Sequence, residues 1–195
     1  MWSQSFRSRL GGGVRLIALL LVLGCGGRGR PSSAPDPLLP EYSPEAASIF
    51  DDVFAPAVFG FDPEGRLLAK DPKLRERIRT ADFVLAARVE TVSRVGGVEH
   101  TGSYELTLAP SGPPLLGEFD GKPIEVSVTT SSPSYLWIDG AGAAWVGSRL
   151  IVFGRRYRAA PGQGGAALHF RCEPDSAEVR GLIARDAGLR YITPP

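Results

Sequence analysis

The spacing of apolar positions changes near residue 82. Before that point, apolar residues recur at helical spacing in two short segments, each opened by a capping residue and a proline. We expect one helix from Ser43-Pro44 to Pro56, a turn over 62–65, and a second helix from Asp71-Pro72. The apolar positions are Ile49, Phe50, Val53 and Phe54 in the first segment and Leu74 and Ile78 in the second.

After that point, apolar and polar residues alternate, as they do in half-buried strands. We expect five strands, near residues 82–94, 104–108, 124–129, 150–153 and 168–172. Gly96-Gly97 indicates a hairpin between the first two strands. The run from Leu150 to Phe153 is continuously apolar, so both faces of the fourth strand should be covered.

The last segment has the spacing of a capped helix. In Asp175-Ser176-Ala177-Glu178, we expect Asp175 to be the N-cap, and we expect Gly188 to end the helix. Five strands and flanking short helices predict a mainly β or α+β fold, either a small antiparallel OB-like barrel or a curled sheet. A simple open α+β sheet is the alternative.

The first thirty residues have the three parts of a secretory signal. Three arginines precede a short apolar run, Leu16 to Leu23, and the small residue Gly24 and then Cys25 follow. A helix that crosses a bilayer needs roughly 20 apolar residues, so this run is too short to remain as a membrane span.

Val22-Leu23-Gly24-Cys25 resembles the lipobox of bacterial lipoproteins. The resemblance covers residues 1–25 and implies that residues 1–24 are removed and that Cys25 is acylated, which would tether the chain to a membrane. An ordinary signal peptide with a coincidental cysteine is the alternative. Gly26 after the cysteine favours the outer membrane, facing the periplasm; the inner membrane and the cell surface stay open.

Composition limits the remaining organisation. Residues 25–43 contain the cysteine and many Gly and Pro residues, which predicts an extended tether, and residues 44–195 should form one β-rich domain. With 22 Lys and Arg against 21 Asp and Glu, the chain lacks the positive field that binds nucleic acid. Two cysteines and two histidines, without ligand spacing, predict neither a cofactor nor a metal site.

A catalytic constellation is not evident. Cys172 should be buried, and His169, three residues away on the same strand, should face the other side of the sheet. We therefore assign no catalytic residue. An envelope hydrolase would have to assemble carboxylates through the fold, and we expect these side chains to be solvated instead. The candidates are Asp51, Asp52, Glu118, Asp120 and Asp139.

Two groups of residues are candidates for binding a ligand or partner. The first is aromatic and lies between the third and fourth strands, where Tyr135, Trp137 and Trp145 would form a platform or, alternatively, plug the end of a barrel. The second is basic: Arg155, Arg156 and Arg158 would meet an anionic envelope surface. Alternatively, the acidic N-terminal segment packs over this basic surface.

These observations favour a lipid-anchored cell-envelope protein that acts as a non-enzymatic binding or assembly module. Its expected partners are the membrane, through the acyl chains, and an envelope protein or glycan, but not nucleic acid. The alternatives are an envelope hydrolase acting on glycan or peptide, and an inhibitor or ligand-carrier barrel.

Overall fold

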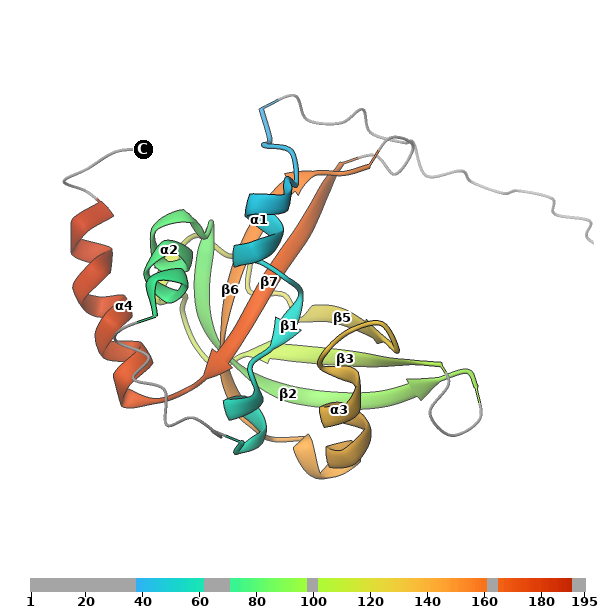
Figure 1. Cartoon of the computed structure of the whole chain (residues 1–195). Coiled ribbons are helices and arrows are strands. Elements are labelled where there is room, and N and C mark those ends of the chain that lie inside the picture. Colours follow the sequence, from blue (N-terminus) through green and yellow to red (C-terminus); the bar gives the residue numbers. More distant parts are fainter. Residues whose placement is uncertain (1–37, 62–70, 98–101, 161–164, 191–195) are drawn as a thin grey trace, which may run out of the picture. The chain divides into compact units, whose positions relative to one another are not determined.

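A seven-stranded sheet organises the residues that the computed structural model describes, namely 38–61, 71–97, 102–160 and 165–190. Its strands are β1 (Val53–Phe54), β2 (Phe83–Val95), β3 (Ser103–Pro110), β4 (Leu116–Gly117), β5 (Ile124–Thr129), β6 (Arg149–Arg158) and β7 (Ala166–Pro174). The order is β1-β7-β6-β2-β3-β5, with β4 also on β2. The sheet curls into an open half-barrel (Figure 1), which confirms the curled-sheet prediction.

All described residues belong to the compact unit Ser32–Pro195, whereas the unit Met1–Pro31 lies outside them. The predicted signal peptide, Cys25, most of the tether, the turn over 62–65 and His100 therefore fall outside the described structure. Residues 39–42, which the sequence assigned to the tether, contact the folded unit: the Arg158 amide donates to the Pro40 carbonyl, and the Tyr42 ring packs against Tyr157.

Helices cover both faces of the sheet. They are α1 (Pro44–Ile49), η1 (Pro56–Phe59), α2 (Pro72–Thr80), α3 (Tyr135–Ala141), η3 (Gly142–Trp145) and α4 (Ala177–Arg190). α2 and α4 lie beside each other over one face, and α3 lies near β3 and β2 (Figure 1). The prediction of α2 is confirmed, with the Asp71 carboxylate accepting a hydrogen bond from the Lys73 amide.

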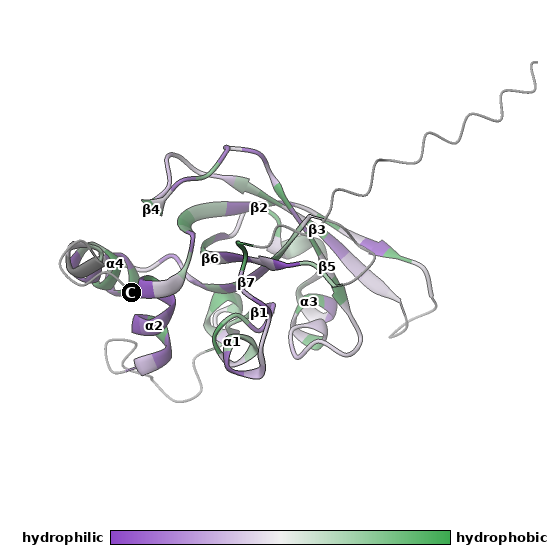
Figure 2. Cartoon of the chain, turned by 90° about the horizontal axis from the view of Figure 1, so that it is seen from above, coloured by the Kyte–Doolittle hydropathy of each residue, from purple (hydrophilic) through white to green (hydrophobic). Residues whose placement is uncertain are grey.

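Strand β6 is buried on both faces, as the apolar run 150–153 predicted. The first five residues of β2 are buried on both faces as well, whereas the sequence predicted a half-buried strand there. Leu85, Leu150 and Val152 point into an inner core that includes residues of β3, β5, α3 and η3. Val84, Ile151 and Phe153 point into an outer core beneath α1, α2 and α4. The apolar colour along the first half of β2 is visible in Figure 2. A bulge between Val89 and Thr91 interrupts the pairing of β2 with β3.

The first predicted helix is shorter than expected. α1 ends at Ile49, and Val53–Phe54 forms β1, which pairs in parallel with Arg171 and Cys172 of β7. Between them, Asp52 adopts a φ of 55°, which redirects the chain. The Asp52 amide then donates to the Phe170 carbonyl, and the Ala55 amide to that of Cys172. Pairing with a sheet edge therefore overrides the helical spacing of Val53 and Phe54.

The ends of the last helix also differ from the prediction. The Ser176 hydroxyl, rather than the Asp175 carboxylate, accepts the Val179 amide proton, so Ser176 is the cap. Asp175 instead binds Arg180 through both carboxylate oxygens. The helix passes Gly188 and ends at Arg190. The buried stripe of Val179, Leu182 and Ile183 is as predicted.

The acidic N-terminal segment packs against the basic strands. Glu41 Oε1 lies 2.9 Å from Arg158 Nη1, and Asp51 Oδ2 lies 2.8 Å from Arg171 Nη1. Asp52 Oδ2 lies 2.7 Å from His169 Nδ1, and the His169 ring stacks on Tyr42 at a centroid distance of 3.5 Å. These contacts agree with the alternative that the acidic N-terminal segment packs against basic side chains of the same chain.

A charged cluster joins this segment to the outer core. Glu173 Oε1 lies 3.2 Å from both Arg77 Nη1 and Arg171 Nε, and both Glu173 and Arg77 are buried. Burial raises the pKa of Glu173, and the neighbouring positive charges of Arg171 and Arg77 oppose that rise. Arg77 Nε also donates to the Ile49 carbonyl at 2.8 Å, which ties α2 to the end of α1. Removal of one partner would leave a buried charge uncompensated.

Gly154 is required for the packing of β2 against β6. A Cβ atom at this position would lie 2.2 Å from the ring of Phe83, which is itself fully buried and packs on Phe119. We expect Gly154→Ala to lower the free energy of unfolding by about 1–3 kcal/mol, as overpacking does, measured by urea denaturation.

Gly181 supplies the matched control. It lies on the exposed side of α4, where a Cβ atom would meet nothing within 4 Å. Gly181→Ala should therefore stabilise the chain by about 0.5–1 kcal/mol through helix propensity. Equal effects of the two substitutions would contradict the packing assigned to Gly154.

Tyr42 makes the free energy of unfolding depend on pH in the alkaline range. Burial, followed by the charges of Asp52 and Asp51, raises the Tyr42 pKa from 10.0 to about 12. The unfolded phenol loses its proton first, so the contribution of Tyr42 is complete below pH 10 and falls as pH rises towards 12. Tyr42→Phe should lower the free energy of unfolding by about 1 kcal/mol at neutral pH, because the variant lacks the hydroxyl that donates to the Phe50 carbonyl. Urea denaturation at several pH values should show a shallower alkaline decline for the variant; parallel curves would contradict this role.

Candidate functional site

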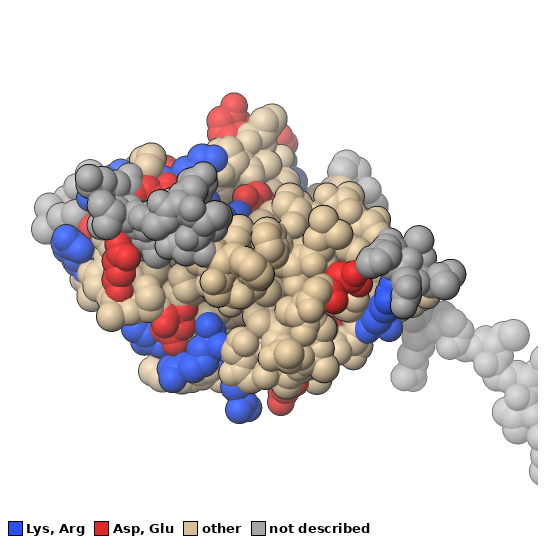
Figure 3. All heavy atoms as spheres, turned by 60° about the horizontal axis from the view of Figure 1, so that its bottom comes forward, with Lys and Arg blue, Asp and Glu red and all other residues tan. Residues whose placement is uncertain are grey.

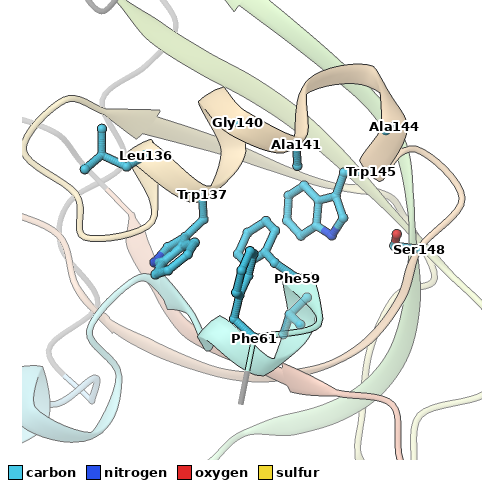
Figure 4. A pocket seen from close by; sticks show the side chains of 10 residues that line it. Phe59, Phe61, Leu136, Trp137, Gly140, Ala141, Ala144, Trp145 and Ser148 are labelled. Atoms are coloured by element: carbon cyan, nitrogen blue, oxygen red, sulfur yellow. The ribbon is translucent and has the colours of Figure 1, made fainter. Parts of the chain in front are cut away.

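An aromatic pocket of about 540 Å³ lies between η1 and the α3–η3 segment. Its volume is within the range of sites for small organic ligands. The lining is mainly apolar and contains no charged side chain (Figure 4). The lining residues are Val58, Phe59, Phe61, Leu136, Trp137, Gly140, Ala141, Ala144, Trp145 and Ser148.

The inner core determines which side of α3 faces the pocket. Tyr135 and Ile138, three residues apart on the helix, are both buried. The Tyr104 hydroxyl donates to Asp139 Oδ1 at 2.6 Å, which fixes α3 to β3. With these positions fixed, Leu136 and Trp137 project away from the core.

A hydrogen bond also ties the start of α3 to β1. The buried Ser134 hydroxyl accepts the Phe54 amide proton at 2.9 Å. Phe54 belongs to β1, which leads through Ala55 into η1, and η1 supplies Phe59 to the pocket. The two sides of the pocket are thus held by one buried contact between residues 80 positions apart in the chain.

Four aromatic rings form a continuous group at the pocket. Phe59 lies 4.5 Å from Trp145 and 6.5 Å from Trp137 between ring centroids, and Phe61 lies 4.8 Å from Trp137. Trp145 is buried, whereas Trp137, Phe61 and Leu136 are 36%, 53% and 73% exposed. Figure 3 shows this end of the molecule as a largely uncharged surface, with charged residues mainly at its margins. Clustered exposed apolar side chains of this kind mark interaction sites.

Two polar groups accompany the rings. The Trp145 indole N–H is buried and has no hydrogen-bond partner among the described residues. Its nitrogen lies on the edge of the indole that faces the space between Phe59 and Ser148 (Figure 4). Ser148 adds a hydroxyl to the lining. The pocket therefore offers an adaptable hydroxyl in uncharged surroundings, and the Trp145 N–H is a buried donor of the same residue group without a partner among the described residues.

The structure brings two of the three predicted aromatic residues together. Trp137 and Trp145 line the pocket, but Tyr135 belongs to the inner core and packs against Tyr104. Phe59 and Phe61 complete the group, and the sequence interpretation missed both. The sequence around Phe59 and Phe61 gave no sign of a site, because these residues meet Trp137 and Trp145 only when the chain folds.

The three predicted arginines do not form one surface. Arg155 lies on the same face of β6 as Tyr157 and over its ring, whereas Arg156 lies on the opposite face, over Phe83. Arg158 is paired with Glu41. Alternation along the strand separates side chains that are adjacent in the sequence.

Cys172 and His169 lie on opposite sides of the sheet, as predicted. Cys172 is fully buried in the inner core, and burial raises its pKa well above the ordinary value, which disfavours the reactive thiolate. His169 faces Asp52 and Tyr42 instead.

The five candidate carboxylates have separate partners or lie in solvent. Asp51 and Asp52 bind β7 rather than lying solvated on a helix, which corrects that expectation. Asp139 accepts a hydrogen bond from Tyr104, and Asp120 is an exposed partner of Lys122. Glu118 is exposed. These contacts give no support to a carboxylate pair of the kind that a glycoside hydrolase uses.

In the described ranges, no cluster of three or more His, Cys, Asp or Glu side chains could hold a metal ion. No helix in those ranges is both apolar enough and long enough to cross a membrane. Compared with known proteins, the chain matches no family model, no curated protein and no solved structure.

Proposed function

We propose that this chain is a lipid-anchored cell-envelope protein whose folded unit is a non-enzymatic binding module, with the aromatic pocket as its binding site. The observation that carries the proposal is the exposed apolar rim of Phe61, Leu136 and Trp137 around an uncharged pocket. Such a rim is costly in water, and burial against a ligand removes that cost. The lipobox-like sequence at Cys25 supports the anchor.

The chemistry of the pocket favours a neutral sugar ring that carries an amide, such as an N-acetylated amino sugar of an envelope glycan. The flat C–H face of a sugar packs against the Trp137 and Phe61 rings. An amide carbonyl accepts a hydrogen bond, which is what the buried Trp145 N–H lacks. The uncharged lining has no counter-ion for a charged ligand.

Trp137→Ala tests the aromatic platform. We expect the variant to bind a soluble oligosaccharide of N-acetylglucosamine at least about tenfold more weakly than the parent chain, measured by isothermal titration calorimetry. Val95→Ala is the matched control, because Val95 is also an exposed apolar residue but lies outside the pocket. It should bind like the parent chain.

Trp145→Phe tests the hydrogen bond, since it removes the N–H and keeps an aromatic ring. The smaller ring also loses packing against Phe54 and Phe59, so the unfolding temperature of the variant is measured beside its affinity. We expect a three- to tenfold loss of affinity, the range of one neutral hydrogen bond. If the parent chain binds an apolar peptide and not the oligosaccharide, the pocket is a protein-docking site and the glycan proposal is wrong.

The anchor has an independent test. Cells that express the chain and are fed a labelled fatty acid should incorporate label into the parent chain, which should fractionate with membranes. Cys25→Ser should abolish the labelling, because the acylated thiol is missing. Unchanged labelling of the variant would show that Cys25 is not the acylation site.

A further inference from the structure

A second pocket, of about 400 Å³, is lined by two arginines from different strands. Arg88 of β2 and Arg149 of β6 are direct cross-strand partners in an antiparallel pair, so their side chains leave the same face of the sheet side by side. The pocket is completed by Ala109, Pro110, Ser111 and Gly147, and no acidic side chain lines it. Like charges placed directly opposite each other destabilise a sheet, so this pair needs an explanation other than folding.

Neighbouring groups compensate only part of this charge. Arg149 Nε lies 3.2 Å from Asp175 Oδ2, but both oxygens of Asp175 also bind Arg180. The Arg88 guanidinium forms no ion pair with any residue that the structure describes. Asp175 therefore faces two arginines, and Arg88 adds a further positive charge beside them.

We propose that this pocket binds the phosphate group of an organic phosphate ester. Each guanidinium presents a fork of N–H donors that fits oxyanions. A phosphate ester carries up to two negative charges and three terminal oxygens, so it can balance both guanidinium charges, whereas a carboxylate carries a single charge. The Ser111 side chain adds a hydroxyl, and the remaining volume accommodates the organic part.

This site is separate from the aromatic pocket, and the proposal does not rest on the glycan function. It also differs from the anionic contact expected at residues 155–158, because Arg155 and Arg156 leave opposite faces of β6 and Arg158 is paired with Glu41. Of the basic residues between 140 and 172, only Arg149 lines this pocket, and it is joined by Arg88 from another strand.

The experiment compares the double variant Arg88→Gln/Arg149→Gln with the parent chain. The first probe is glycerol 3-phosphate, titrated by calorimetry. We expect the double variant to bind it at least about tenfold more weakly, the loss that follows from removing charge-assisted hydrogen bonds. Arg75→Gln/Arg185→Gln is the control, because it removes the same charge from two exposed helical positions outside the pocket.

A second probe distinguishes the sources of the phosphate. Full chains carrying Cys25→Ser are mixed with vesicles of phosphatidylcholine alone or of phosphatidylcholine and phosphatidylglycerol in equal amounts, and flotation measures binding. Extra binding to the anionic vesicles that depends on Arg88 and Arg149 identifies a lipid headgroup. If the chain binds glycerol 3-phosphate but shows no extra binding to the anionic vesicles, the ligand is a soluble ester.

The stability of the double variant separates a binding role from a structural one. Without ligand, the variant should unfold at a temperature close to that of the parent chain, because repulsion between Arg88 and Arg149 is relieved and the buried Asp175 carboxylate keeps both of its contacts with Arg180. Glycerol 3-phosphate should raise the unfolding temperature of the parent chain and of the control variant, but not that of the double variant Arg88→Gln/Arg149→Gln. If neither probe binds, or if the control and pocket variants lose binding equally, the proposal is wrong.

Discussion

The need to bury both faces of β2 and β6 governs the rest of this structure. These strands carry continuous apolar runs, so each has an inner and an outer set of side chains that must leave water. The inner set is enclosed by the curl of the sheet together with α3 and η3, and the outer set by α1, α2 and α4. Gly154 permits the close contact of the two strands because the Phe83 ring occupies the space that a side chain would need.

The same constraint explains why the N-terminal segment forms charged contacts. With the outer face of β6 covered by helices, the adjacent face of β7 is left with polar residues, His169, Arg171 and Glu173. The segment from Glu41 to Asp52 supplies carboxylates to the first two and, through the Ile49 carbonyl, a contact to Arg77, which binds Glu173. Complementary charge thus adds to the burial of Phe50 in the outer core in fixing this segment.

Much of the fold can be predicted from the spacing of apolar residues and from helix caps, but contacts between distant segments cannot. Alternation located β2, β3, β5 and β7, the continuous apolar run located β6, and Asp71-Pro72 located α2. β1 was missed because two residues cannot show a period; only their hydrogen bonds to β7 identify them. α3 was missed because Gly140 and Gly142 suggested a loop, although Tyr135 and Ile138 have helical spacing.

The candidate sites show the same division. Trp137 and Trp145 could be selected from the sequence because large aromatic residues in a connecting segment are informative by themselves. Phe61 and Arg88 could not, since each becomes notable only through its neighbour from another element. Adjacent arginines on one strand gave a misleading signal, because alternation sends Arg155 and Arg156 to opposite faces.

Alternation also places the two pockets on different sides of one short segment. Ser148 lines the aromatic pocket, whereas its neighbours Gly147 and Arg149 line the arginine pocket. Backbone hydrogen bonds from Gly147 to Val89 and from Val89 to Ser148 hold this segment against β2, so the sheet itself separates the sites. One side chain cannot serve both pockets, and a neutral ligand and an anionic ligand would bind without competing for the same groups.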